Sequence, residues 1–269
     1  MGSDYTHFLD LQCRSRQRTF KGDRTSGMYD SNGLCRSNVS VVNQEEANVH
    51  EEIRSSLEID AILVPQGAEY ATVQRACRSR LPVFAVPAGA AVAEYLPTLP
   101  LGPWQRVLVM GLCGSLDDRY GIGDIVLYRA TISTSGRCLE CDRELLTGLA
   151  GVFPEKDQVL ALTSPQVVFR SADKQQYRQQ LGAVVVDMEG QTVQSILAER
   201  GIAVGTIRVV SDDSHHDLPD LSDAFDDLGQ LQSWSLVKAV ARDPVAGVRL
   251  VRGSLQALRV LDRVARQLN

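Results

Sequence analysis

The chain has 269 residues and a formal net charge of −5 at pH 7, from 28 Lys and Arg residues against 33 Asp and Glu residues. This acidic balance provides no basic face for nucleic acid or anionic lipid, and every apolar run is far too short to span a bilayer. The six cysteines follow no apolar signal segment and are expected to be reduced thiols. We therefore expect a cytoplasmic protein with no nucleic-acid partner and no membrane span.

The start of the chain differs from the rest in composition. It is rich in Arg, Ser, Asn, Asp and Gly and has no sustained apolar period. We predict a polar N-terminal extension over residues 1–55, expected to be disordered, and a folded domain over residues 56–269. Two alternatives exist for the extension. Translation could start at the internal Met28, or the segment could add a strand to a partner.

From Ile59 onward, short β-branched runs alternate with amphipathic segments of helical length, which is the pattern of a sheet covered by helices. The pattern predicts an α/β fold with strands over residues 62–64, 83–86, 106–110, 124–132, 158–162, 183–186 and 204–210. Helices are predicted up to residue 78, over 172–181, over 190–201, and as a pair over 223–269 that is separated near Asp243 and Pro244. The last helix carries an apolar stripe, which we expect to pack in the core or against a second copy.

Carboxylates stand at the ends of two predicted strands. Asp187-Met188-Glu189 follows one of them, and Ser211-Asp212 follows the next. Proteins of the α/β class usually bind ligands in the crevice beyond the carboxyl ends of their strands, so Glu189 and Asp212 are expected to face one pocket. An acidic residue after a strand is also commonly a helix cap, which is the alternative for Asp187 and Asp212.

A third predicted strand is followed by Gly111 and Gly114. A loop without side chains lets a ligand approach backbone amides, so these two glycines are candidate binding residues.

Two further groups of residues have the composition of metal or redox sites. His215 and His216 stand among aspartates, but adjacent histidines on a loop rarely face one ion, so we expect a solvated loop. Cys138 and Cys141 have the spacing of a zinc knuckle or redox pair but lack a second pair, so we interpret them as incidental thiols.

Four segments together carry a resemblance to an enzyme family: residues 111–115, 123–126, 185–190 and 207–212. In this order they resemble the purine nucleoside phosphorylase and methylthioadenosine/S-adenosylhomocysteine nucleosidase superfamily, over about Asp60 to Asp213. The run from Val168 to Lys174 is similar to the phosphorylase-like branch that includes hopanoid-associated nucleoside phosphorylases. The resemblance implies a three-layer sandwich, in which helices flank a central mixed, mostly parallel β-sheet.

The resemblance also implies an activity, the cleavage of the N-glycosidic bond of a purine nucleoside. The aspartate of the Ser-Asp pair, here Asp212, would act as general acid toward the purine N7, with Asp213 as the fallback. Such an acid needs its neutral form to be favoured, most simply by burial. Glu189 would bind the ribose hydroxyls above an apolar floor formed by Met188.

Supporting roles follow from the same resemblance. Arg208 and Ser211 would hold the acidic residues in place. Glu69 falls where nucleosidases keep a glutamate that orients the attacking water. A glutamate in a first helical turn also favours the helix dipole, which is the alternative for Glu69.

The sequence departs from the family at two places. Phosphorylases place arginine and a hydroxyl residue at the glycine loop, whereas residues 109–113 contain neither, so water is the expected nucleophile. A phosphate-dependent phosphorylase is the alternative, with Arg170 or a partner subunit's arginine supplying the charge. The base-binding segment is also altered and offers Val168 and Phe169, which leaves the base and the 5′ substituent open. This change motivates a third hypothesis, a catalytically inactive nucleoside-binding or storage homologue.

The expected partner is a small-molecule nucleoside, together with phosphate in the alternative mechanism. No metal or organic cofactor is expected, because an aspartic acid and an oriented water suffice for the chemistry. Family members often complete the pocket with a neighbour's side chains, so the resemblance implies a homodimer or larger homo-oligomer.

Overall fold

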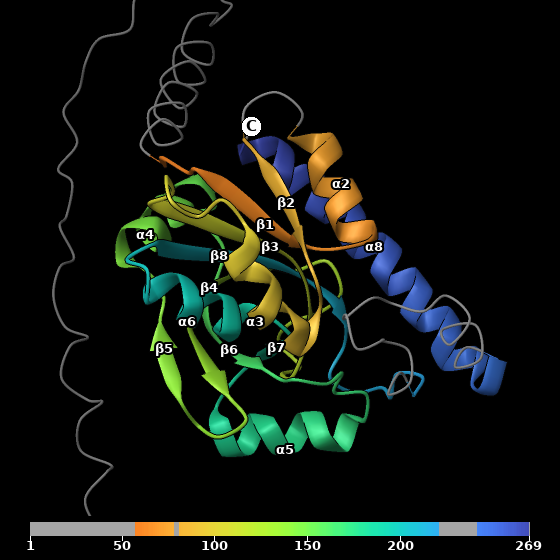
Figure 1. Ribbon diagram of the computed structural model, residues 1–269. Helices are drawn as coiled ribbons and strands as arrows, with labels where there is room; N and C mark the ends of the chain where they lie inside the picture. The colour runs from red at the N-terminus through yellow and green to blue at the C-terminus, as the bar shows by residue number, and fades with distance from the viewer. Residues whose placement is uncertain (1–56, 78–80, 221–240, 269) are drawn as a thin grey trace, which may run out of the picture. The chain divides into compact units, whose positions relative to one another are not determined.

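The computed structural model describes residues 57–77, 81–220 and 241–268 (Figure 1). These residues belong to one compact unit, Glu46–Asn269. The predicted extension over residues 1–55 and the first of the two predicted C-terminal helices lie outside the described residues. Among the helices that are described, each is too short or too polar to cross a bilayer.

The centre of the described unit is one mixed sheet. Its strands are β1 (Ala61–Pro65), β2 (Val83–Val86), β3 (Arg106–Ser115), β4 (Ile125–Ser133), β5 (Cys138–Glu140), β6 (Gln158–Thr163), β7 (Val185–Asp187) and β8 (Ala203–Asp212). The order is β2-β1-β3-β7-β6-β4-β5, and β8 pairs with both β3 and β4. The strands β3, β7, β6, β4 and β8 therefore form a closed ring in which each pairs with the next.

Most pairings in this sheet are parallel. β1 pairs in parallel with β2 and β3, β8 with β3, and β6 with β4 and β7. The pairs β3–β7, β4–β5 and β4–β8 are antiparallel. This mixture is the predicted one, and the antiparallel pairs are those that close the ring and extend its edge.

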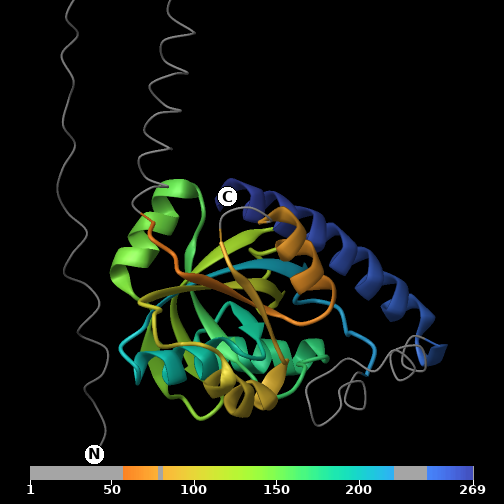
Figure 2. The ribbon, with the colours of Figure 1, turned by 45° about the horizontal axis from the view of Figure 1, so that its top comes forward.

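Helices cover both faces of the sheet (Figure 2). One face carries α2 (Ala68–Ala76), α4 (Arg143–Val152) and α8 (Pro244–Leu268). The other face carries α3 (Val92–Tyr95), with its flanking short helices η1 (Gly89–Ala91) and η2 (Leu96–Thr98), and α6 (Gly190–Ala198). A further helix, α5 (Ser171–Leu181), packs beside β6 and β7.

Alternation along the strands explains the layers, because successive side chains of a strand point to opposite faces. In β1, Ile62 and Val64 join the core under α2 and α8, whereas Ala61 and Leu63 join the core under α3 and α6. The predicted three-layer α/β sandwich is thereby confirmed.

The third strand differs from its predicted bounds, and the apolar stripe of the last helix is divided between the core and the surface. The third strand does not end at Met110 but runs through both glycines to Ser115, because β8 offers it a parallel partner from Arg106 to Gly114. In α8, the apolar stripe is only partly buried. Leu261 and Val264 lie in the core, whereas Val251 and Leu255 are exposed.

Candidate active site

The carboxyl end of β8 carries the first group of candidate residues. The pairing with β3 shifts register here, so that Cys113 pairs with Val210 and Gly114 with Asp212, which leaves Ser211 as the extra residue of a bulge. Bulges re-aim side chains and are frequent beside active sites. The Ser211 hydroxyl lies 2.9 Å from Oδ1 of Asp212 and 3.2 Å from the carbonyl oxygen of Cys113, and its single proton serves one of them at a time.

The other carboxylate oxygen of Asp212 meets a residue that the sequence did not single out. Lys174, from α5, donates from Nζ to Oδ2 of Asp212 at 2.5 Å and to the carbonyl oxygen of Asp213 at 2.6 Å. The lysine side chain is 0% exposed and that of Asp212 is 13% exposed. Asp212 is thus largely buried, as expected, and in addition it is paired with a buried cation.

Asp213 is occupied by its own loop. Its Oδ1 accepts the backbone N–H groups of His215 and His216, each at 2.9 Å, and the His216 ring lies at the same distance. This arrangement is a local turn facing solvent, and within the described ranges no group of three or more potential metal ligands occurs. Asp213 is therefore poorly placed to serve as the fallback acid.

A second group of charges is centred on Arg208 of β8, whose side chain is 0% exposed. Its Nη2 atom lies 3.2 Å from Oδ2 of Asp187 and 3.4 Å from Oε2 of Glu189. Burial lowers the pKa of Arg208, but the surrounding acids outweigh it and raise the pKa above its ordinary value. The guanidinium is therefore a permanent positive charge inside the fold.

The two acids after β7 have different surroundings. Oδ1 of Asp187 accepts the Gly190 N–H at 3.1 Å and the Thr163 hydroxyl at 2.8 Å, so Asp187 caps the first turn of α6. Glu189 turns the other way, and its Oε1 accepts the N–H of Gly89 at 3.1 Å. The cap alternative thus describes Asp187, whereas Glu189 holds the N-cap position of α6 without a side-chain hydrogen bond to that helix.

Glu69 reaches the same group from α2. Its Oε2 accepts the Leu112 N–H at 2.6 Å, which ties the first turn of α2 to β3. Gly111 makes this approach possible, because a Cβ there would lie 2.5 Å from Oε2 of Glu69 and would overlap Nη1 of Arg208. The space that a side chain at Gly111 would occupy is thus filled by the charged groups of Glu69 and Arg208.

Farther along β3, the lack of a side chain at Gly114 likewise lets a charged group approach the strand. A Cβ at this position would lie 2.9 Å from Oδ2 of Asp212. Gly89 lies close to Met188, whose Cε would be 3.3 Å from an added Cβ. Val168 and Phe169 lie on the loop before α5, and the Phe169 ring stacks with the Arg170 guanidinium at 5.5 Å.

Burial changes the ionisation of the glutamates in the second group. Burial raises the pKa of Glu69 to about 7, against the opposing effect of the Arg208 guanidinium and with a smaller contribution from Glu189. Burial likewise raises the pKa of Glu189, again opposed by Arg208 and aided by Asp187. A carboxyl group poised near neutral pH is suited to exchange a proton during a reaction.

We expect the free energy of unfolding to fall as the pH rises from about 4.5 to about 7. In this window the folded state keeps a proton on Glu69 that the unfolded state has released, because the folded pKa is about 7 and the ordinary value is 4.5. The substitution Glu69→Gln should therefore flatten the slope, as measured by urea unfolding at several pH values. Glu144→Gln, at a side chain that is 80% exposed, is the control that should leave the slope unchanged.

The substitution Gly111→Ala should destabilise the protein by about 1–3 kcal/mol, because the new methyl group forces buried side chains apart. Urea unfolding at constant pH measures this loss. Gly102→Ala is the matched control, since a Cβ at Gly102 meets nothing within 4 Å. Equal stability of the two variants would show that Glu69 and Arg208 do not cross over Gly111 as described.

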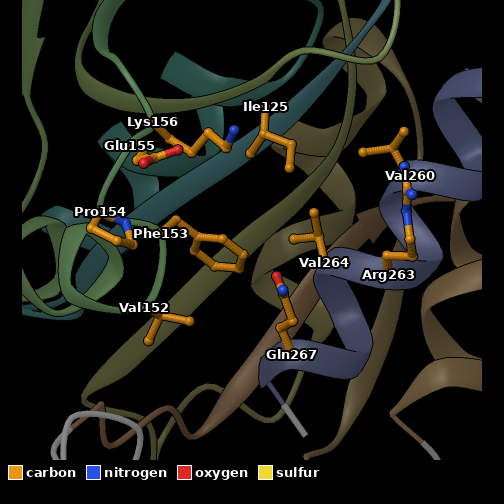
Figure 3. A pocket seen from close by; sticks show the side chains of 10 residues that line it. All are labelled: Ile125, Val152, Phe153, Pro154, Glu155, Lys156, Val260, Arg263, Val264 and Gln267. Atoms are coloured by element: carbon orange, nitrogen blue, oxygen red, sulfur yellow. The ribbon is translucent and has the colours of Figure 1, made fainter. Parts of the chain in front are cut away.

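A larger hollow than the one beside Asp212 lies elsewhere on the described surface. A groove of about 380 Å³ runs between the end of α4 and the C-terminal half of α8, with Phe153 and Val264 at its centre (Figure 3). None of the candidate site residues lines it, and it brings together no group of acids. A smaller hollow adjoins Ser211 and Asp212. We place the site at the strand ends because the buried charges converge there.

The fold is that of the α/β class, with buried acids at the ends of its strands. The sequence profile of the phosphorylase superfamily matches residues 86–242, which is more than half of the chain. The chain therefore belongs to the phosphorylase superfamily, as the four segments predicted, and this membership supports an enzyme acting on nucleosides. No curated protein sequence matches the chain.

Solved structures share the fold at low identity. Futalosine hydrolase of Helicobacter pylori has a TM-score of 0.60 and 13% identity, covering 79% of this chain and 97% of that one. The 5′-methylthioadenosine/S-adenosylhomocysteine nucleosidase of the same organism has a TM-score of 0.59 and 13% identity, covering 79% of this chain and 97% of that one. A putative nucleosidase of this kind from Borrelia burgdorferi, bound to adenine, has a TM-score of 0.58 and 13% identity, covering 78% of this chain and 98% of that one. At these identities the similarity shows the shared fold.

Proposed function

We propose that the protein hydrolyses the N-glycosidic bond of a purine nucleoside. The observation that carries this proposal is the convergence of three acids on β8: Glu69 from α2 and Glu189 from the start of α6 lie at Arg208, and Asp212 stands four residues farther along β8. Four residues of a strand span about 13 Å. Glu69 and Glu189 at one end of this span can contact the ribose of a nucleoside, while Asp212 at the other end contacts its base.

Each acid has a distinct part in the proposed reaction. Asp212 gives a proton to the purine as the bond to C1′ breaks. Glu189 accepts hydrogen bonds from the ribose hydroxyls, since a carboxylate can accept two at once. Glu69, with its pKa raised to about 7 by burial, orients a water molecule and takes its proton as it attacks C1′.

The charges around these acids favour water over phosphate as nucleophile. Phosphate is a dianion and needs cationic or several amide partners. Both buried cations of the site are engaged with carboxylates, Arg208 with Asp187 and Glu189, and Lys174 with Asp212. Arg170 is exposed and lies against the Phe169 ring.

Incubation with adenosine, inosine and 5′-substituted adenosines, with and without phosphate, tests the proposal. Free base is followed by chromatography. Release of base without phosphate is the expected result. Release that strictly requires phosphate or arsenate would replace the hydrolase by a phosphorylase. Tight binding without turnover would replace it by an inactive nucleoside-binding protein.

We also infer that the protein forms a homodimer or larger homo-oligomer. The N-terminal half of α8 exposes Val245, Val248, Val251 and Leu255, with exposed fractions of 47 to 70%. Light scattering on the purified protein measures its mass. A monomer at micromolar concentration would overturn this part of the proposal.

A further inference from the structure

Lys174 is a fully buried lysine that the proposed reaction has not used so far. Lysine is almost never fully buried unless its charge is paired. Here Nζ donates to the carboxylate of Asp212 at 2.5 Å and to the carbonyl oxygen of Asp213 at 2.6 Å. Both acceptors lie directly after the bulge at the end of β8.

Asp212 is held on three sides. Its Oδ2 lies between the Lys174 ammonium and the bare Cα of Gly114, and its Oδ1 lies 2.9 Å from the Ser211 hydroxyl. Each carboxylate oxygen has two lone pairs, so both remain able to contact a substrate. The carboxylate is therefore fixed in direction before any ligand arrives.

The position of Lys174 is also fixed independently of this ion pair. The loop before α5 is tied to the loop after β8, because the Leu218 N–H donates to the Phe169 carbonyl oxygen at 2.8 Å. In addition, the Ser171 N–H donates to Oδ1 of Asp217 at 2.7 Å. These bonds hold the first turn of α5 against the end of β8, so the lysine is presented to Asp212 by the backbone.

We propose that Lys174 is the positioning residue of the general acid: its ammonium holds the carboxyl group of Asp212 toward the leaving base and stabilises the carboxylate that proton transfer leaves behind. This inference rests on the proposed function. In the reacting enzyme the carboxyl group of Asp212 carries a proton, and its Oδ2 faces the Lys174 ammonium. As the bond from C1′ to the base breaks, its electron pair passes to the base, which takes that proton. Lys174 stays protonated and stabilises the carboxylate that remains on Asp212. Water bonds to C1′ and loses a proton to Glu69, and exchange with solvent later returns a proton to Asp212 and removes one from Glu69.

A pair of substrates separates this role from a merely structural one. A purine needs a proton to depart, whereas 4-nitrophenyl β-D-ribofuranoside releases a stable phenolate without one. In the full-length variant Lys174→Met, kcat for adenosine should fall by about 10²- to 10⁴-fold, the usual contribution of general acid catalysis. Its KM for adenosine and its turnover of the nitrophenyl riboside should stay within a few-fold of wild type.

Three further variants complete the test. Lys174→Arg, which keeps a cation, should restore part of the adenosine turnover. Lys156→Met makes the same change at a lysine of the groove near Phe153 and should leave both substrates unaffected. Glu69→Gln should slow both substrates, because each needs an activated water.

The outcomes distinguish the inference from the proposed function. If Lys174→Met loses turnover of both substrates equally, Lys174 is a structural residue. If it keeps its turnover of adenosine, Lys174 has no part in the reaction. If Lys174→Arg turns over adenosine no faster than Lys174→Met, the inference is also overturned. A wild-type protein that cleaves neither substrate would overturn the proposed function, and the inference with it.

Discussion

The substitution Asp212→Asn should lower the rate of base release by about 10²- to 10⁴-fold while the fold persists. Asparagine has nearly the same shape and keeps one acceptor oxygen for Lys174, but it cannot pass a proton to the base. Chromatography of free purine measures the rate, and circular dichroism measures the fold. The KM should change much less than kcat, because the lost interaction belongs to the transition state.

Asp213→Asn is the control for this prediction. Asp213 accepts the N–H groups of His215 and His216, so its loss should alter the loop and leave turnover within a few-fold of wild type. Full activity of Asp212→Asn would eliminate Asp212 as the acid. Loss of activity in Asp213→Asn alone would transfer the role to Asp213.

The substitution Arg208→Met should destabilise the protein by about 3–5 kcal/mol, which is the usual cost of removing one partner from a buried ion pair. Methionine fills part of the space but leaves the carboxylates of Asp187 and Glu189 in the core without their cation. Urea unfolding at neutral pH measures the loss. The variant should also be inactive, since Glu189 would no longer be held toward the site.

Two variants check the cause of this loss. Arg106→Met removes an arginine whose partners Glu144 and Glu58 are largely exposed, and should cost about 0–1 kcal/mol. Adding Asp187→Asn to Arg208→Met removes one stranded charge and should recover part of the stability. A double variant no more stable than the single one would show that packing, not charge, sets the cost.

Much of the fold could be predicted from local pattern. The run from Val83 to Val86 is a strand with the predicted bounds, and the predicted helix over residues 172–181 is α5 with one more residue at its start. Such elements follow from β-branched runs and amphipathic spacing, which are properties of neighbouring residues. The family resemblance extended the prediction to the three layers, which the two cores on either side of the sheet confirm. The superfamily match confirms the family.

The remainder depends on contacts between distant residues. Lys174 is one lysine in a polar helix, and its burial is decided by the loop after β8, which lies far along the chain. The continuation of β3 through Gly111 likewise depends on a partner strand. A weak signal did exist for the glycines, because close spacing of glycines in an apolar run also indicates that other groups approach the backbone.

The ring of strands constrains the order in which the protein folds. β8 must lie against both β3 and β4, and its partner residues in β3 are roughly 100 positions earlier in the chain, so ring closure bears the entropy of a long loop. Until β8 has been synthesised, β3 and β4 keep open edges that invite pairing with other chains. Asp212 is the last residue of this strand. The candidate active site is therefore assembled only when β8, the last strand among the described residues, arrives, and nascent chains that stop before it should depend on chaperones to stay out of aggregates.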